Sequence, residues 1–284
     1  MMELEPGIIY AYASDFLKED FGRGDVTTQC VVRSGVRARG QFLAKQDMVL
    51  CGLEFAEAVF GVLDSAIALE SHAYDGQSIN AGTRFARIEA PAGVLLAGER
   101  TALNLLQHMS GVATLTRAFV DRIHGTGARI IDTRKTTPGL RLIEKYAVSA
   151  GGGSNHRFGL DDGILIKDNH IALAGGIKRA VELARHSAPH LLKLEVEAST
   201  LAQVRESLEA RADIIMLDNM QTADLAAAVR LIREQAPDTI IEASGNVTLD
   251  NVREVAETGV NLISVGAITH SAGAMDISMK VSAA

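Results

Sequence analysis

The chain has 284 residues, and its 28 Lys and Arg against 35 Asp and Glu give a formal net charge of −7. Apolar residues make up 47% and charged residues 22%, which excludes a disordered chain and allows one large domain or two small ones. The acidic balance argues against a general nucleic-acid-binding protein, which needs a basic face. It leaves room for one local basic pocket.

The cysteine content and the lack of an apolar run of membrane-spanning length indicate the cellular compartment of the protein. Two cysteines, Cys30 and Cys51, cannot form a disulfide framework and are typical of a reducing compartment. The first residues show no signal-peptide pattern, and no apolar run approaches the roughly 20 residues of a membrane span. We therefore expect a cytoplasmic protein with no membrane segment.

Short extended stretches separated by Gly and Asn turns dominate the first part of the chain. They predict strands at 37–45, 66–72 and 83–89, with a helix at 53–63, and so a small α+β domain. A long helical region follows at 99–124, where apolar residues recur at helical spacing.

We place the domain junction inside this helical region, in which Gly111 is a candidate break. The expected domains are 1–110 and 111–270. The tail at 271–284 is expected to pack on the first domain.

From residue 129 on, short β-branched runs alternate with amphipathic helices. The last four runs end at intervals of 21 to 26 residues, and repeated units of this size predict a parallel sheet. Six or seven units suggest an incomplete barrel, and a doubly wound open sheet is the alternative. The predicted strands are 129–132, 163–167, 191–197, 213–218, 239–244 and 261–266. The predicted helices between them include 176–186, 201–210, 223–234 and 250–258.

A charged or hydrogen-bonding residue stands at the carboxyl end of every predicted strand. In an α/β barrel this end of the sheet holds the active site, so six such positions in succession indicate a functional site. Any one of them alone would be expected at an exposed strand end. The positions are Asp132 to Lys135, Lys167 to Asn169, Glu195 with Glu197, Asp218 with Asn219, Ser244 to Asn246, and Gly266.

The stretch 129–157 is the most unusual in charge. It holds six basic against two acidic residues, a net charge of +4, so the remaining chain carries −11. It also contains a glycine run at 151–153, followed by His156 and Arg157. Glycines allow backbone N–H groups to approach an anion, and arginine matches a carboxylate or phosphate. A solvated basic face with a flexible loop is the alternative interpretation.

Two further patterns suggest ligands. The turns at 244–246 and 266–267 follow the last two strands, where barrels often bind phosphate. Glu197 and Asp218 end adjacent strands, where they could hold Mg²⁺ or balance nearby basic residues. Lys167 at a strand end could also serve as a Schiff-base lysine.

At this point the chain resembles the quinolinate phosphoribosyltransferase family, also called nicotinate-nucleotide pyrophosphorylase (carboxylating). The matching motifs are ERTALN at 99–104, DTRKTTPG at 132–139, GGGSNHR at 151–157 and LIKDNH at 165–170. Further matches are GRGDVTT at 22–28, EVE at 195–197, LDNM at 217–220, EASG at 242–245 and ISVGA at 263–267. The resemblance extends in order over essentially the whole chain.

The resemblance implies both a fold and a reaction. The fold is an N-terminal α/β sandwich followed by an incomplete, seven-stranded TIM-like α/β barrel. The reaction joins quinolinate to phosphoribosyl pyrophosphate with Mg²⁺, and releases nicotinate mononucleotide, pyrophosphate and CO₂ in de novo NAD biosynthesis. Members form homodimers with shared active sites, and a hexamer is left open.

The resemblance also implies roles for individual residues. Glu197, Asp218, Lys135 and Lys167 would be catalytic, and the two carboxylates would also bind the metal. The quinolinate pocket would comprise Arg100 reaching into the partner's site, with Arg134, Lys135, His156, Arg157 and Lys167. The phosphate and ribose would be bound by Ser244, Gly245, Asn246, Val265 and Gly266, although Asn246 stands where many members have a second glycine.

Three other functions remain open at this point. A paralogue associated with molybdate uptake shares the scaffold with a different substrate. A barrel aldolase would use Lys167 as a Schiff base. A non-catalytic, dimeric anion-binding protein would bind quinolinate without turnover.

Overall fold

The structure, a computed structural model, describes residues 2–284 and divides into two compact units. Unit 1 comprises the described part of Met1–Arg117 together with Leu142–Gly152 and Ser271–Ala284. Unit 2 comprises Ala118–Arg141 and Gly153–His270. Segments far apart in sequence therefore build each unit.

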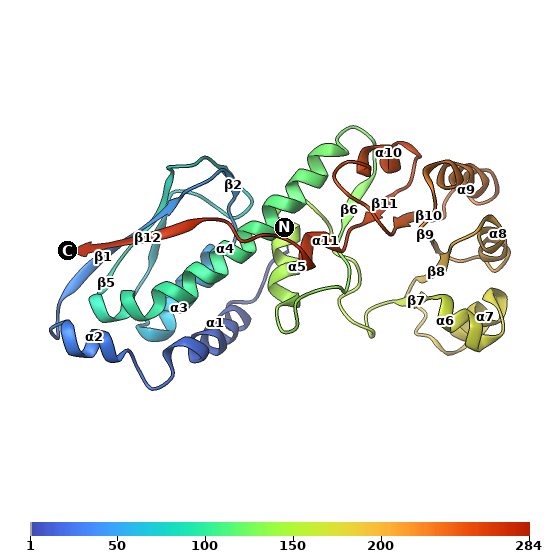
Figure 1. Ribbon diagram of the computed structural model, residues 1–284. Coiled ribbons are helices and arrows are strands. Elements are labelled where there is room, and N and C mark those ends of the chain that lie inside the picture. Colours follow the sequence, from blue (N-terminus) through green and yellow to red (C-terminus); the bar gives the residue numbers. More distant parts are fainter. Residues whose placement is uncertain (1) are drawn as a thin grey trace. The chain divides into compact units, whose positions relative to one another are not determined.

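Unit 1 is built on a four-stranded antiparallel sheet (Figure 1). Its strand order is β12 (Ile277–Ala283), β1 (Arg37–Ala44), β5 (Arg84–Pro91), β3 (Leu69–Ser71). Alternate side chains of β1 are buried, as expected for a strand with one face on a core. The C-terminal tail enters this sheet because β12 pairs with β1 over seven residues.

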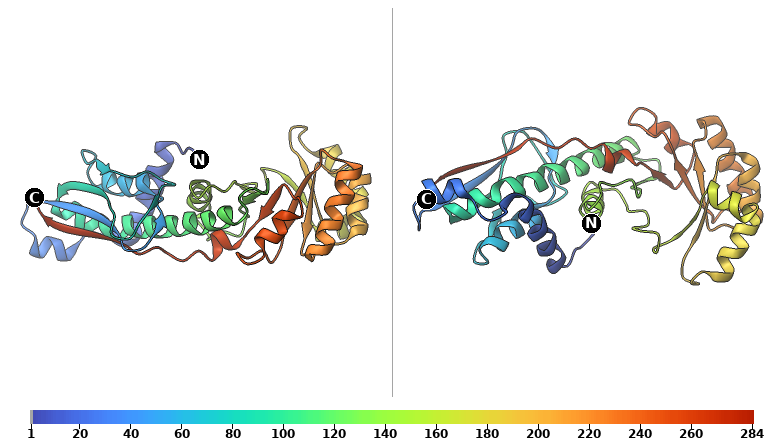
Figure 2. Two further views of the ribbon diagram at one scale, coloured as in Figure 1. Left: turned by 90° about the horizontal axis from the view of Figure 1, so that it is seen from above. Right: turned by 60° about the horizontal axis from the view of Figure 1, so that its bottom comes forward.

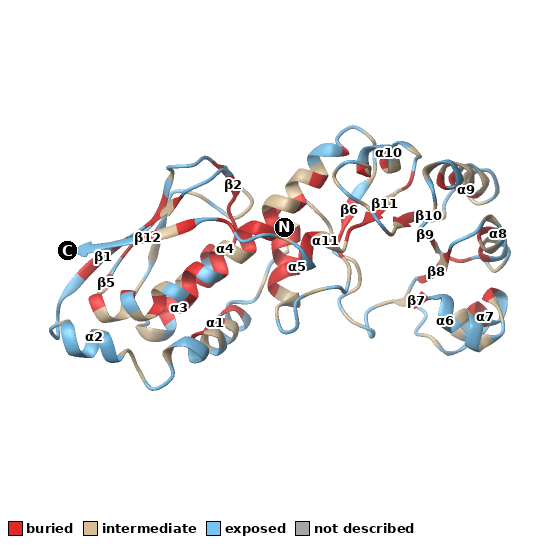
Figure 3. Ribbon diagram, in the orientation of Figure 1, coloured by how far each residue is buried: buried red, intermediate tan, exposed pale blue. Residues whose placement is uncertain are grey.

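Helices cover one face of this sheet. Phe42 of β1 meets Phe60 of a helix and Phe85 of β5, with ring centroids 6.4 and 5.9 Å apart. Buried residues concentrate on α3 (Leu53–Leu63) and along parts of α4 (Ala92–Arg122), whereas α2 (Val26–Val31) has none (Figure 3). The unit also contains α1 (Pro6–Phe21) and α5 (Arg141–Ala150), and β2 (Met48–Val49) pairs with β4 (Ser78–Ile79).

Helix α4 runs unbroken through Gly111, so the candidate break at this glycine is wrong. A Cβ at Gly111 would lie 2.1 Å from the carbonyl oxygen of Gly273. The glycine therefore allows the tail to approach the helix backbone, and its role is close packing.

Unit 2 contains a six-stranded parallel sheet (Figure 1). The strand order is β6 (Arg129–Ile131), β11 (Leu262–Ser264), β10 (Ile240–Ser244), β9 (Ile214–Asp218), β8 (Leu194–Ala198), β7 (Ile164–Ile166). Within this sheet, the first strand in chain order, β6, therefore pairs with the last, β11. A parallel bridge from Ile131 to Ser154 adds a seventh position beside β6.

This topology decides between the two architectures that the sequence allows. The strands from β7 to β11 follow one another in chain order, and helices α7 (Ile177–Ser187), α8 (Leu201–Glu209) and α9 (Thr222–Gln235) lie on a single face (Figure 2). In a doubly wound sheet, the order of the strands would reverse at one point, and helices would cover both faces. The arrangement is that of an incomplete α/β barrel. Shorter helices are α6 (Asp168–Ala174), α10 (Val252–Glu257) and α11 (Ala267–His270).

Among residues 2–284, no helix combines the length and the apolar character that crossing a membrane requires.

Candidate active site

A cleft of about 500 Å³ opens at the carboxyl ends of the parallel strands of unit 2. Successive residues of a strand face opposite sides of the sheet. The wall of the cleft is therefore formed by every second residue of a strand. Ten predicted site residues line this cleft: Arg134, Lys135, His156, Arg157, Lys167, Glu197, Asp218, Ser244, Gly245 and Asn246. Residues up to 112 positions apart in sequence are thus brought together, from 134 to 246.

Three predicted residues lie outside the lining of the cleft. Val265 is buried, and Gly266 lies behind Lys135, where a Cβ would be 3.1 Å from Lys135 Cδ. Arg100 is an exposed residue of α4 in unit 1. The predicted roles of these three residues remain predictions.

Four cations surround the cleft: Arg134, Lys135, Arg157 and Lys167. Burial, together with the positive charge of Arg134, lowers the pKa of Arg157. An arginine nevertheless keeps its charge in a protein. The repulsion between the neighbouring positive charges of Arg134 and Arg157 is therefore unfavourable, and a bound anion would reduce it. The cleft is therefore suited to a ligand with more than one negative charge.

Hydrogen bonds fix the backbone that carries two of these cations. Arg141 donates to the carbonyl oxygens of Arg134 (3.2 Å) and Phe158 (3.1 Å), and Thr269 donates to that of Lys135 (2.8 Å). Arg141 was counted in the basic stretch, and the structure uses it as a clamp between two segments of the cleft wall.

The glycine run at 151–153 does not line the cleft. A Cβ at Gly151 would lie 2.5 Å from the carbonyl oxygen of Ala113 and 2.6 Å from Thr116 Cβ, both in α4. Arg117 also donates to the Gly151 carbonyl (2.9 Å). Gly151 is therefore needed for packing on α4, and the expectation that the run approaches an anion stays a prediction.

Two carboxylates and a lysine occupy the ends of β7, β8 and β9. Lys167 Nζ lies 3.5 Å from Glu197 Oε2. Burial raises the pKa of Glu197, Lys167 opposes this shift, and the carboxylates of Asp218 and Asp168 add to it. An ion-paired lysine suits anion binding, whereas a Schiff-base nucleophile must be a neutral amine.

The turn after β10 has a backbone that suits a close-fitting ligand. Gly245 and Asn246 have φ values of 93° and 52° in the left-handed region. Asn246 Nδ2 donates to Asn219 Oδ1 (3.0 Å), and Asn219 Nδ2 donates to Asp218 Oδ2 (2.6 Å). The turn is thereby linked to the carboxylate at the end of β9. The following helix begins at Val252, two residues later than predicted.

Sequence reasoning assigned no role to six residues that line the cleft: Thr133, Leu165, Met216, Asn219, Glu242 and Ser264. Alternation provided a signal for four of them, because each lies two residues before a predicted site residue on the same strand or at its end: Leu165, Met216, Glu242 and Ser264. Glu195 stands in the same relation to Glu197 on β8.

The fold and the cleft define a class: an α/β-barrel protein with a multiply cationic site at the carboxyl ends of its strands. Sequence comparison gives the family. The family model described as "Quinolinate phosphoribosyl transferase, N-terminal domain" matches residues 25–110, and the corresponding C-terminal domain model matches 112–280. The chain belongs to the quinolinate phosphoribosyl transferase family, which confirms the resemblance seen in its motifs.

Individual relatives agree over nearly their whole length. The chain is 46% identical to a probable nicotinate-nucleotide pyrophosphorylase [carboxylating] from Synechocystis, covering 96% of this chain and 92% of the relative. It is 45% identical to one of the same name from Bacillus subtilis, covering 94% and 91%. The crystal structure of NadC from Streptococcus pyogenes matches with a TM-score of 0.95 at 38% identity, covering 100% of both chains. The expected fold class is thus confirmed.

Proposed function

We propose that this protein transfers the phosphoribosyl group of phosphoribosyl pyrophosphate to quinolinate and decarboxylates the product. The products are nicotinate mononucleotide, pyrophosphate and CO₂, in the de novo synthesis of NAD. The observation that carries the proposal is the group of four cations around one cleft, in a member of this family. Quinolinate has two adjacent carboxylates, and its pocket needs more positive charge than that for a monocarboxylate.

The cationic side chains would hold quinolinate and orient its ring nitrogen. Arg134 and Arg157 offer planar guanidinium forks that match carboxylates, while Lys135 and Lys167 act as point charges. His156 lies in the wall beside Arg157. Binding of the dianion would relieve the repulsion between Arg134 and Arg157, which makes both arginines contributors to substrate affinity.

The turn at Ser244, Gly245 and Asn246 would bind the 5′-phosphate of the second substrate. Positive φ at two successive residues turns backbone N–H groups toward one side, which is how such turns accommodate anions. Val265 and Gly266 follow the neighbouring strand β11 and would complete this end of the site.

The residues present fit a magnesium ion. Oxygen ligands suit Mg²⁺, and Glu197 and Asp218 end adjacent strands. Burial raises the pKa of Glu197, and the nearby carboxylates of Asp218 and Asp168 add to this shift, so a bound cation would stabilise the charged carboxylate. When bound, Mg²⁺ would neutralise negative charge on the pyrophosphate group.

In the reaction, the pyridine nitrogen forms a bond to ribose C1 as the bond from C1 to the pyrophosphate oxygen breaks. The ribosyl group is positively charged in the transition state, and Glu197 or Asp218 would stabilise it, while Lys135 and Lys167 stabilise the negative charge of the substrates. The pyridinium then accepts the electron pair of the breaking C2–carboxylate bond, and a proton replaces the released CO₂. No covalent enzyme nucleophile is required.

The direct test supplies purified protein with quinolinate, phosphoribosyl pyrophosphate and MgCl₂. We expect CO₂ release coupled to nicotinate mononucleotide formation. Absence of product across neutral pH would refute the proposal. Other aromatic acids, assayed in parallel, would reveal a change of substrate within the scaffold.

We further propose a cytoplasmic homodimer with shared active sites. The two cysteines are free thiols, which fits a reducing compartment. The exposed position of Arg100 on α4 leaves it available to a second chain. Light scattering would establish the assembly and whether dimers associate further.

A further inference from the structure

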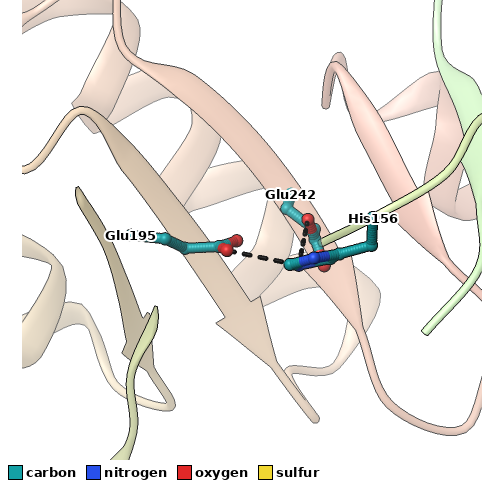
Figure 4. Close-up of side chains that lie close together, drawn as sticks. All are labelled: His156, Glu195 and Glu242. Atoms are coloured by element: carbon teal, nitrogen blue, oxygen red, sulfur yellow. Dashed lines mark ion pairs between the residues drawn. The ribbon is translucent and has the colours of Figure 1, made fainter. Parts of the chain in front are cut away.

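Three side chains in unit 2 form a cluster that joins His156 of the cleft wall to two buried glutamates, which have no role in the proposed reaction (Figure 4). His156 follows the Ser154 bridge, Glu195 lies on β8, and Glu242 lies on β10. His156 Nε2 lies 3.2 Å from Glu195 Oε2 and 3.7 Å from Glu242 Oε2. The glutamate side chains are only 5% and 2% exposed.

Two buried carboxyl groups need an explanation beside a cleft that is proposed to bind a dianion. Burial raises the pKa of Glu242 well above its usual range, and the neighbouring Glu195 carboxylate adds to the shift. The raised pKa favours the protonated form of Glu242, and the shorter distance makes Glu195 Oε2 the nearer acceptor for His156. The Oε1 atoms of both glutamates have no hydrogen-bond partner within residues 2–284. A full set of hydrogen bonds from neighbouring residues therefore does not explain why these two carboxyl groups are buried.

The two ring nitrogens of His156 face different partners. Nδ1 accepts the backbone N–H of Arg157 at 2.6 Å. A nitrogen that accepts a hydrogen bond carries no proton, so the imidazole proton lies on Nε2, which faces Glu195. The geometry thus selects one tautomer of the neutral ring.

The same contacts fasten the segment that carries Arg157. Asp132 is fully buried and accepts the backbone N–H of His156 (2.8 Å) and Nδ2 of Asn155 (2.6 Å). The Arg157 guanidinium donates to the carbonyl oxygen of Gly163 (2.8 Å). The His156 ring therefore connects the interior carboxylates to the backbone of a cleft arginine.

We propose that Glu195 and Glu242 are positioning residues for substrate binding, which hold His156 as its neutral Nε2–H tautomer and so present Arg157 to the cleft. The inference rests on the proposed function, because quinolinate is the ligand that Arg157 would meet. It assigns the two glutamates a role through His156 and no contact with the reacting atoms.

The tautomer can be measured without any turnover. In the full-length protein labelled with ¹⁵N, long-range ¹H–¹⁵N correlation spectra distinguish the three protonation states of each of the eight histidines. The His156 signal is assigned as the one lost in His156→Asn. We expect the Nε2–H tautomer at neutral pH. An imidazolium or an Nδ1–H tautomer would overturn the proposal, whatever the enzyme activity shows.

Steady-state kinetics test the positioning. Glu195→Ala should raise the KM for quinolinate about tenfold, as for loss of one charge-assisted hydrogen bond, and leave the KM for phosphoribosyl pyrophosphate within about twofold. Glu195→Gln should recover most of this loss, because its carboxamide oxygen can accept the same Nε2–H. Glu242→Ala should raise the same KM, and Glu242→Gln should recover most of this loss, since an amide N–H can donate to Glu195 as the acid does.

The outcomes separate this proposal from its competitors. Unchanged quinolinate KM in Glu195→Ala, or no recovery in a folded Glu195→Gln, would overturn the positioning role. Zn²⁺ binding that Glu242→Gln abolishes and Asp218→Asn preserves would make the three residues metal ligands and also overturn it. If the wild type fails to turn over quinolinate, the proposed function fails, and the tautomer measurement still decides how His156 is held.

Discussion

Arg134 and Arg157 are neighbours in the cleft, and each adds to the electrostatic cost of the other. We predict that Arg134→Ala raises the KM for quinolinate by about 10- to 100-fold, because charge-assisted hydrogen bonds contribute about 1.5–3 kcal/mol. Its exposed position means that the fold should not change. Steady-state kinetics with varied quinolinate, and circular dichroism of the variant, provide the measurement.

A matched control for this prediction lies on the same segment. Arg129 is exposed at the start of β6, at the opposite end of the strand from the cleft. Arg129→Ala removes the same formal charge and should leave the quinolinate KM within about twofold of wild type. Equal effects of the two substitutions would show that net charge, and not the cleft, determines binding.

Glu242 gives a prediction for stability as a function of pH. The pKa of Glu242 in the folded protein is raised above the ordinary value of 4.5. At pH values between the unfolded and the folded pKa, the protein therefore takes up a proton when it folds. Stability from this group is full at low pH and is lost as pH rises toward the folded pKa, at up to about 1.4 kcal/mol per pH unit. The Tm of wild type should therefore fall relative to that of Glu242→Gln as the pH rises above the ordinary pKa of 4.5. A constant difference in thermal unfolding would contradict the buried neutral acid.

Among the structural elements, the turn after β10 shows how backbone conformation forms a site. Gly245 has φ +93°, and a Cβ there would lie 2.2 Å from Asn219 Oδ1. Gly245→Ala should displace Asn219 and raise the KM for phosphoribosyl pyrophosphate more than about tenfold. Gly259→Ala is the control, because it has φ +94° but meets only Val229 Cγ1 at 3.5 Å, in the turn before β11. Similar substrate KM values for the two variants would count against the phosphate role.

Helix α4 offers a second test of an element. Gly111→Ala should lower stability by about 1–3 kcal/mol or more, because the new Cβ would overlap the Gly273 carbonyl. Gly93→Ala, near the start of the same helix, meets only Thr28 Cγ2 at 3.7 Å and should be neutral or stabilising. Thermal unfolding of both variants checks the packing role, and equal Tm values would contradict it.

The strands of unit 2 could be predicted from sequence because each is a short buried run followed by an amphipathic helix. Observed strands such as Ile214–Asp218 and Ile240–Ser244 differ from prediction by a single residue. Helix α1 was not predicted, because it buries only Ile9, Ala13 and Leu17, a narrow stripe whose partner α3 is known only from the fold. Elements in which apolar residues recur with a clear period can thus be predicted from the local sequence. The other elements depend on packing against residues that are distant in sequence.

The site was predictable to a similar degree. Charged and hydrogen-bonding residues at strand ends are visible in the sequence, and ten of the thirteen predicted site residues do meet in one cleft. The packing role of Gly151 was missed because a glycine needed for packing and a glycine that approaches an anion look the same in sequence. The link from Glu195 to Arg157 through His156 depends on which ring nitrogen faces which partner, which no sequence pattern specifies.

For the whole molecule, the net charge of −7 conceals a local excess of positive charge. Three of the six basic residues in 129–157 line the cleft: Arg134, Lys135 and Arg157. A small anion therefore meets a cationic site on an acidic protein. The acidic remainder favours solubility and disfavours nonspecific binding to polyanions.

The proposed homodimer leads to a complementation test. If Arg100 completes the partner's site, Arg100→Ala and Arg134→Ala each impair every site of their own homodimer when quinolinate is held at or below the wild-type KM. In a mixed dimer, one site takes both substitutions and the other takes neither. Random reassociation makes half of the dimers mixed, so the mixture should recover about a quarter of wild-type activity. The measurement is CO₂ release at this limiting quinolinate concentration, after the two impaired proteins are dissociated and reassociated together. Activity that stays at the level of either variant alone would mean that Arg100 acts within its own chain or not at all.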